Sequence, residues 1–178
     1  MKRLVRVLVI AVVSLVVAVV LATAMGLLLP RRHVAATRVL LQRTPDEVWT
    51  AISDLPSQSE WRSDLEGAER LPDHEGREVW LQRTDHGDWT LEFTTREAPR
   101  LLVTTVADSS QGFGGSWTYE IGTVDTGTVL TITETGFIDS PLFRFLARFV
   151  FGLHGSQEAY LRDLVEHLGE SAAPHRVL

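Results

Sequence analysis

Three side chains could carry out acid–base chemistry in places where a ligand could reach them: Glu134, Tyr119 and His154. Glu134 continues the alternation of the apolar residues Leu130 and Ile132, and a carboxylate on an apolar wall can act as an acid, a base or a hydrogen-bond partner. If the strand twists or bulges near its end, Glu134 instead meets solvent. His154 lies in a helical pattern between two glycines, and either a pocket position or a partly exposed one is consistent with that pattern.

Other catalytic and metal-binding groups are scarce in this chain. Cysteine is absent, which excludes disulfides, thiolate metal sites and a cysteine nucleophile. No two histidines have metal-site spacing, and no serine lies in a Gly-x-Ser-x-Gly motif. We therefore expect neither a metal nor a cofactor. Four histidines fall in a linker, in turns or in the tail, where we expect solvent exposure: His33, His74, His86 and His175.

A long apolar segment near the N-terminus predicts a membrane anchor. Residues 7–29 are 23 residues without a charge, and a helix over about residues 5–29 is long enough to cross a bilayer. A cleaved signal peptide is the alternative, because the start is basic and Ala22-Thr23-Ala24 resembles a cleavage site. The apolar run is longer than a signal core, which favours a retained single-pass helix. The basic residues before the helix favour an N-terminus in the cytoplasm and a domain outside, although Arg31 and Arg32 on the far side partly balance them.

The charge of the remaining chain limits its partners. Residues 1–33 hold five of the 17 basic residues and none of the 23 acidic ones, so the rest carries a formal charge of −11. Such a domain repels phosphate backbones, and we expect no nucleic-acid partner. The sequence leaves the oligomeric state open.

The order of elements predicts an α+β domain. A strand over residues 34–41 leads into a helix that begins with the capping box Thr44-Pro45-Asp46-Glu47, and a second short helical piece ends around residues 60–62. Residues 141–168, between Ser140 and Gly169, predict one final helix with a bend at Gly152 and Gly155. Turn residues divide the intervening chain into six antiparallel strands over residues 65–71, 78–84, 89–96, 101–107, 115–124 and 128–138.

These elements resemble the helix-grip fold of the Bet v 1/START-like (SRPBCC) superfamily, and within it the polyketide cyclase/dehydrase and lipid-transport group. The resemblance rests on the Thr44 to Trp49 helix start, on Glu60-Trp61, on the strand entry at 114–119 and on the helix end at 160–164. It implies a curved seven-stranded antiparallel sheet around a long C-terminal helix. The predicted domains are an anchor over residues 1–33, a START-like domain over 34–170 and a flexible tail over 171–178.

The resemblance also implies an elongated apolar cavity between the sheet and the final helix. Its candidate ligand-binding residues are Trp89, Leu91, Phe93, Trp117, Tyr119, Ile121, Leu130, Ile132, Glu134, Phe145, Phe149 and Leu153. Each of these residues could equally be ordinary core packing.

We therefore expect a membrane-tethered, non-catalytic binding protein for a lipid or other apolar small molecule. The alternative is a cyclase/dehydrase-like enzyme in which Glu134, Tyr119 or His154 moves a proton. A third reading is a protein-interaction role in which the cavity matters little. Fold alone does not choose among these functions.

Overall fold

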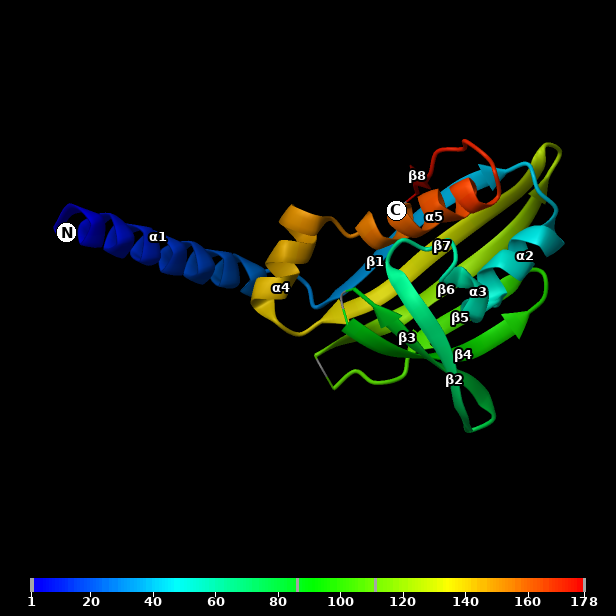
Figure 1. Ribbon diagram of the computed structural model, residues 1–178, viewed down its shortest axis with the longest axis horizontal. Helices are drawn as coiled ribbons and strands as arrows, with labels where there is room; N and C mark the ends of the chain where they lie inside the picture. The colour runs from blue at the N-terminus through cyan, green and yellow to red at the C-terminus, as the bar shows by residue number, and fades with distance from the viewer. Residues whose placement is uncertain (1, 86, 111, 178) are drawn as a thin grey trace.

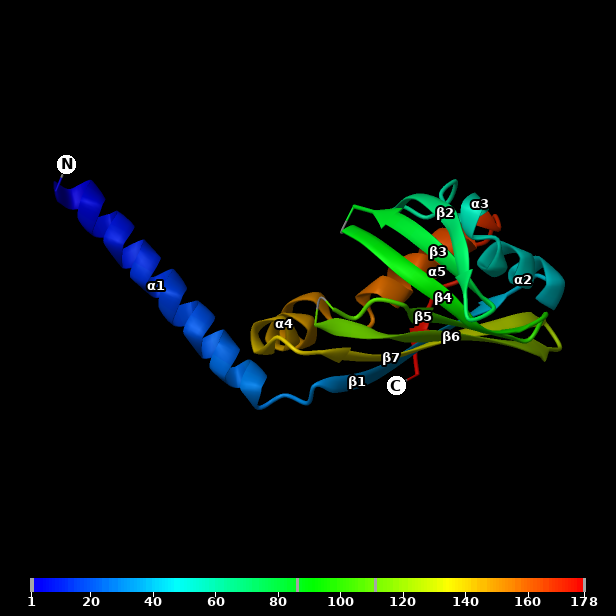
Figure 2. The ribbon, with the colours of Figure 1, turned by 90° about the horizontal axis from the view of Figure 1, so that it is seen from below.

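The computed structural model describes residues 2–85, 87–110 and 112–177. Its centre is a curved eight-stranded antiparallel sheet with the strand order β2-β3-β4-β5-β6-β7-β1-β8 (Figures 1 and 2). The strands are β1 (Arg32–Leu41), β2 (Leu65–His74), β3 (Arg77–Thr84), β4 (Gly87–Glu97), β5 (Leu101–Val106), β6 (Phe113–Val124), β7 (Gly127–Ile138) and β8 (His175–Arg176). The helices are α1 (Lys2–Leu27), α2 (Pro45–Ser53), α3 (Leu55–Gln58), α4 (Pro141–Leu146), the π-helical η1 (Ala147–Phe151) and α5 (Gly155–His167).

The α+β helix-grip fold predicted from the sequence is confirmed. The start of α2 shows how a few neighbouring residues determine where a helix begins. The Thr44 hydroxyl accepts from the backbone of Glu47, and the Glu47 carboxylate accepts from the backbone of Thr44 at 2.8 Å. This capping box satisfies two backbone donors that the first helical turn leaves free. It fixes the point at which β1 gives way to helix.

The C-terminal helix differs from the prediction, because the chain breaks it instead of bending it. α4 and η1 end at Phe151, Gly152 adopts the left-handed φ of 78°, and α5 begins only at Gly155. A left-handed residue cannot continue a right-handed helix, so the two halves separate. In both ribbon views α5 lies against the sheet, whereas α4 lies beside the end of α1 (Figures 1 and 2).

The sheet gains a short strand that was not expected. The C-terminal segment, which we expected to be a flexible tail, forms β8, and β8 pairs with β1 through Thr37 and Arg38. The backbone N–H of Val177 also donates to the carbonyl of Ala36 at 2.8 Å. β8 therefore covers the outer edge of β1.

The core lies between the inner face of the sheet and α2, α3 and α5. Its fully buried side chains include Leu102 from β5, Leu130 and Ile132 from β7, and Leu161 and Leu164 from α5. Buried polar bonds also hold α5 to β1. The Gln157 amide accepts from the Thr37 hydroxyl at 2.7 Å and donates to the Ala35 carbonyl at 3.0 Å.

Helix α1 is long and apolar enough to cross a membrane, and it is exposed along most of its length. Its C-terminal end packs against the domain, where Gly26 is buried against α4. A Cβ at Gly26 would lie 1.8 Å from the carbonyl oxygen of Pro141, so only glycine allows this approach.

Candidate functional site

Glu134 lies on the inner face of β7, as predicted, and both of its carboxylate oxygens are engaged. Oε1 is 3.0 Å from Nε2 of His33, and Oε2 accepts from the indole Nε1 of Trp117 at 3.0 Å. The side chains of His33 and Glu134 are 14% and 21% exposed. The structure therefore places an acid–base pair at the rim of the core, where solvent or a ligand can still reach it.

His33 corrects the sequence-based expectation that this residue is exposed in a linker. It belongs to β1 and pairs with Gly136 of β7, where a Cβ would lie 2.7 Å from the imidazole ring. The inward residues of β1 are Leu41, Val39, Thr37 and Ala35, and extending that alternation by two residues reaches His33. The strand pattern could therefore have revealed it.

Two of the other histidines that we expected to be exposed, His74 and His175, lie away from this site. His74 lies at the end of β2, where its Nδ1 is 2.7 Å from Glu92, and its side chain is 64% exposed. His175 is exposed in β8. His86 lies outside the described residues. Among those residues, no group of three or more metal-ligating side chains occurs.

An aromatic and cationic centre continues inward from Trp117. The Trp117 ring meets the edge of Tyr160 at 5.9 Å, and Tyr119 lies 5.8 Å from Tyr160, measured between ring centroids. The guanidinium of Arg62 lies 5.3 Å from the centre of the Tyr160 ring, as in a cation–π contact. Arg62 also donates to both oxygens of Asp64, at 3.0 and 2.8 Å, and its side chain is only 11% exposed.

Two buried donors in this centre have no hydrogen-bond partner among the described residues. They are the Tyr160 hydroxyl and the Trp61 indole N–H. Burial raises the pKa of Tyr119 to about 12 and raises the pKa of Tyr160 well above its usual value, so both phenols stay protonated at neutral pH. The centre can therefore donate a hydrogen bond to a ligand carbonyl or hydroxyl, and Tyr160 would gain a missing partner.

At the end nearest α1 the large side chains of the inner face are only half-buried. We call the half-buried residues Trp89, Leu91, Phe113 and Trp117 the α1-side patch. The Trp89 and Phe113 rings meet edge to face at 5.0 Å. They are only half-buried because α4 leaves the sheet and α5 begins only at Gly155. The patch borders the His33–Glu134 pair through Trp117.

The remaining candidate residues divide into three groups. Phe93, Ile121, Leu130 and Ile132 are buried within the core, where they touch other core side chains. The rings of Phe145 and Phe149 contact each other at a tilt of 47°, with their centroids 5.1 Å apart, but Phe149 is 57% exposed on η1 and does not line the inner face. Leu153 and His154 are half-buried in the break before α5.

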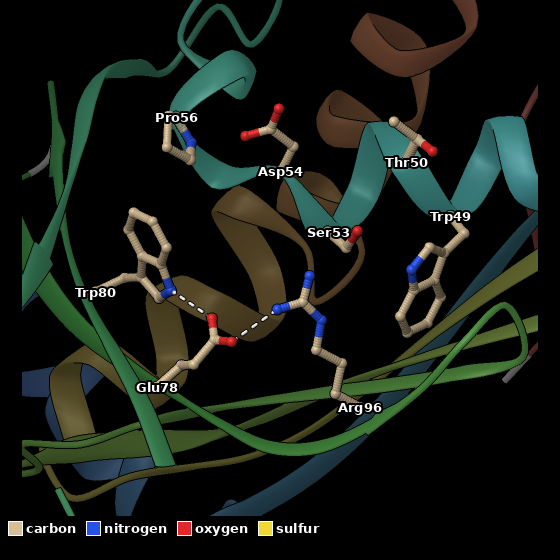
Figure 3. A pocket seen from close by; sticks show the side chains of 8 residues that line it. All are labelled: Trp49, Thr50, Ser53, Asp54, Pro56, Glu78, Trp80 and Arg96. Atoms are coloured by element: carbon tan, nitrogen blue, oxygen red, sulfur yellow. Dashed lines mark hydrogen bonds and ion pairs between the residues drawn. The ribbon is translucent and has the colours of Figure 1, made fainter. Parts of the chain in front are cut away.

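Core side chains pack between the sheet and α5, and neither of the two best-defined hollows among the described residues lies there, where the elongated cavity was expected. The best-defined hollow, about 350 Å³, lies instead between α2–α3 and β3–β4, with Trp49 and Trp80 among its walls (Figure 3). There Glu78 accepts from Arg96 at 2.8 Å and from the Trp80 indole at 3.3 Å. A second hollow lies on the outer face of β6 and β7, around Gly122 and Val129. Neither hollow includes the Glu134 pair.

Several solved structures are similar to this one and identify its fold. The di-domain aromatase/cyclase StfQ from the steffimycin biosynthetic pathway is 12% identical in sequence, with a TM-score of 0.61. The match covers 74% of this chain and 49% of the StfQ chain. For the Zhui aromatase/cyclase from Streptomyces sp. R1128 the identity is 16%, the TM-score 0.63 and the coverage 78% and 94%. For a START superfamily protein from Mycobacterium smegmatis the values are 13%, 0.62, 77% and 97%. The chain thus has the helix-grip fold of START-like structures, and it spans about half of the di-domain StfQ chain.

The family follows from the sequence itself. Residues 31–169 match the family model described as polyketide cyclase/dehydrase and lipid transport, and the chain belongs to that family. No curated protein matches the sequence significantly.

Proposed function

We propose that the protein binds a lipid or other apolar small molecule on the inner face of its sheet while α1 anchors it in a membrane. One observation supports the proposal: the inner face is fully packed beneath α5, whereas its aromatic side chains at the end beside α1 are only half-buried. The ligand's apolar part would cover the α1-side patch. Its polar group would meet the His33–Glu134 pair or the free hydroxyl of Tyr160.

Anchoring explains how such a ligand would reach the site. A sparingly soluble molecule partitions into the bilayer, and a binding face held beside the bilayer meets it at a high effective concentration. Only residues 28–31 separate α1 from β1, so this end of the sheet stays close to the anchor. Retention of α1 and uptake from the membrane are parts of one proposal.

Native mass spectrometry of the full-length protein, released from mild detergent, tests lipid binding. Leu91→Asn places an amide in the α1-side patch, and Leu40→Asn makes the same change on the exposed outer side of β1, where Leu40 is 45% exposed. We expect the patch variant to retain several-fold less lipid than the wild type and the control to retain the same amount. Lipids held by α1 itself are common to all three proteins.

Equal lipid retention in the two variants, or a wild type that carries no more lipid than α1 alone explains, would contradict the proposal. Thermal unfolding of both variants shows whether the Leu91 change has unfolded the domain. Only a loss of lipid in a folded variant counts as support.

The His33–Glu134 pair favours one alternative, a cyclase/dehydrase-like enzyme. In an aldol cyclisation with loss of water, a base removes a proton next to a carbonyl and an acid protonates the departing hydroxyl. Glu134 has the hydrogen-bonded position of such a base, and His33 lies within 3.0 Å to exchange the proton with it. The buried phenols of Tyr119 and Tyr160 would hold the carbonyl oxygen.

A poly-β-ketone thioester is the probe for this alternative. Glu134→Gln keeps the size of the side chain and removes the base, so turnover should fall by about 100-fold or more with binding unchanged. Glu120→Gln, on the exposed side of the neighbouring strand, is the matched control. Full turnover by the Glu134 variant removes this residue from the mechanism and leaves the binding function.

A further inference from the structure

The segment formed by α4 and η1 exposes more large apolar side chains than any role inside the domain requires. Four of them are more than half exposed, namely Phe143 (60%), Phe149 (57%), Val150 (61%) and Phe151 (68%). Apolar surface concentrated in this way marks an interaction surface. The core, which is complete without these residues, does not use them.

The position of the segment identifies its partner. α4 packs on the last turn of α1 through Pro141 and Gly26, and the Arg144 guanidinium donates to the carbonyl of Leu29 at 2.7 Å. Both ribbon views place α4 beside the C-terminal end of α1, away from the far end of the sheet (Figures 1 and 2). Any bilayer that α1 crosses has its surface at this level.

The charge of the segment points to the same partner. Residues 141–153 contain two arginines, Arg144 and Arg148, and no acidic residue, although the chain beyond residue 33 is strongly acidic. Arginine beside exposed aromatic side chains is the composition of helices that lie in the headgroup region of a membrane. A cationic segment is also attracted to anionic lipids.

We propose that α4 and η1 form a second membrane contact, which lies in the bilayer interface with its aromatic side chains among the acyl chains. This inference rests on the proposed anchoring by α1. The two contacts together fix the orientation of the domain, so that the α1-side patch faces the membrane surface. A one-helix tether alone would leave the domain free to turn.

The absence of cysteine makes the depth of the segment directly measurable. Single cysteines at exposed positions accept a nitroxide, and power-saturation EPR compares its accessibility to oxygen, which concentrates in the bilayer, with that to a water-soluble nickel chelate. The full chain is reconstituted in phosphatidylcholine vesicles that contain phosphatidylglycerol. The test positions are Phe149→Cys and Phe151→Cys.

Two further labels serve as references. Leu15→Cys lies in the middle of α1, where Leu15 is 65% exposed, and reports whether α1 is in the bilayer. Val124→Cys, at the far end of β6 and 41% exposed, reports the aqueous phase. We expect the Phe149 and Phe151 labels to have an oxygen-to-nickel ratio well above that of Val124 and below that of Leu15.

The outcomes separate this inference from the function on which it rests. If Leu15 is in the bilayer but Phe149 and Phe151 match Val124, the interfacial contact is refuted and the anchor stands. Spin–spin broadening between copies at Phe149 and Phe151 assigns the surface to a second copy and also refutes it. If Leu15 itself reports water, the anchor fails, and the proposed membrane function fails with it.

Discussion

Gln157 offers the sharpest test of how α5 is fixed to the sheet. Its amide lies at 0% exposure between α5 and β1, where it accepts from the Thr37 hydroxyl at 2.7 Å and donates to the Ala35 carbonyl at 3.0 Å. Gln157→Leu keeps almost the same volume but removes both bonds. The variant therefore leaves two buried polar groups of β1 without their α5 partner.

The cost follows from the burial of those groups. A buried group that loses its partner costs about 1–3 kcal/mol, and the new leucine returns roughly 1–2 kcal/mol of apolar burial. We expect the variant to lose about 2 kcal/mol of unfolding free energy. Thr37→Val in the same chain removes the stranded hydroxyl, and the double variant should recover about 1 kcal/mol relative to Gln157→Leu alone.

Urea unfolding of the full chain in micelles, followed by tryptophan fluorescence, measures these differences. A loss of about 2 kcal/mol corresponds to a midpoint about 1 M lower. Gln42→Leu makes the same change on the exposed surface and should stay within about 0.5 kcal/mol of the wild type. A Gln157→Leu protein as stable as this control, or a double variant with no recovery, would refute the reasoning.

Three other outcomes follow from the structure. Burial raises the pKa of Tyr119 to about 12, so the folded state holds this proton more tightly than the unfolded chain does. The resulting stability is present below about pH 10 and falls by about 2–3 kcal/mol as the pH rises to about 12. Tyr119→Phe should flatten this part of the plot of unfolding free energy against pH. Thr44→Ala removes the cap of α2 and should cost about 1 kcal/mol in urea unfolding, whereas full stability would show that the capping box contributes little. Gly26→Ala forces a methyl group against the Pro141 carbonyl and should speed amide exchange in α4, while Gly67→Ala, with open space around it, should not; equal exchange in both would contradict the close packing of α1 on α4.

The candidate site lies elsewhere than in the cavity that the fold suggested, and the break in the C-terminal helix is the cause. The expected cavity needed a continuous helix from Ser140 to Gly169 above the sheet. The break at Gly152 leaves α5 to fill the inner face with its own side chains and carries Phe149 away to the surface. The half-buried aromatic side chains of the inner face are consequently at one end of the sheet, beside α1.

The sequence by itself determined the features that depend on neighbouring residues. The capping box at Thr44, the apolar length of α1, the turn residues between strands and the two-residue alternation of β7 each act within a few positions, so they are readable without contacts. This was enough to predict the fold class and to place Glu134 on the inner face. The fold class and the face of β7 on which Glu134 lies could therefore be predicted from the sequence.

Only the tertiary structure decided which groups meet. His33 reaches Glu134 across 101 residues because β1 pairs with β7 in one register, and the Arg144 bond to Leu29 spans 115 residues. Whether the last helix bends or breaks at Gly152 depends on whether α4 packs better on another element than on the sheet. The close approach of α1 at Gly26 provides such a packing surface. Such choices depend on distant packing energies, which no local pattern in the chain contains.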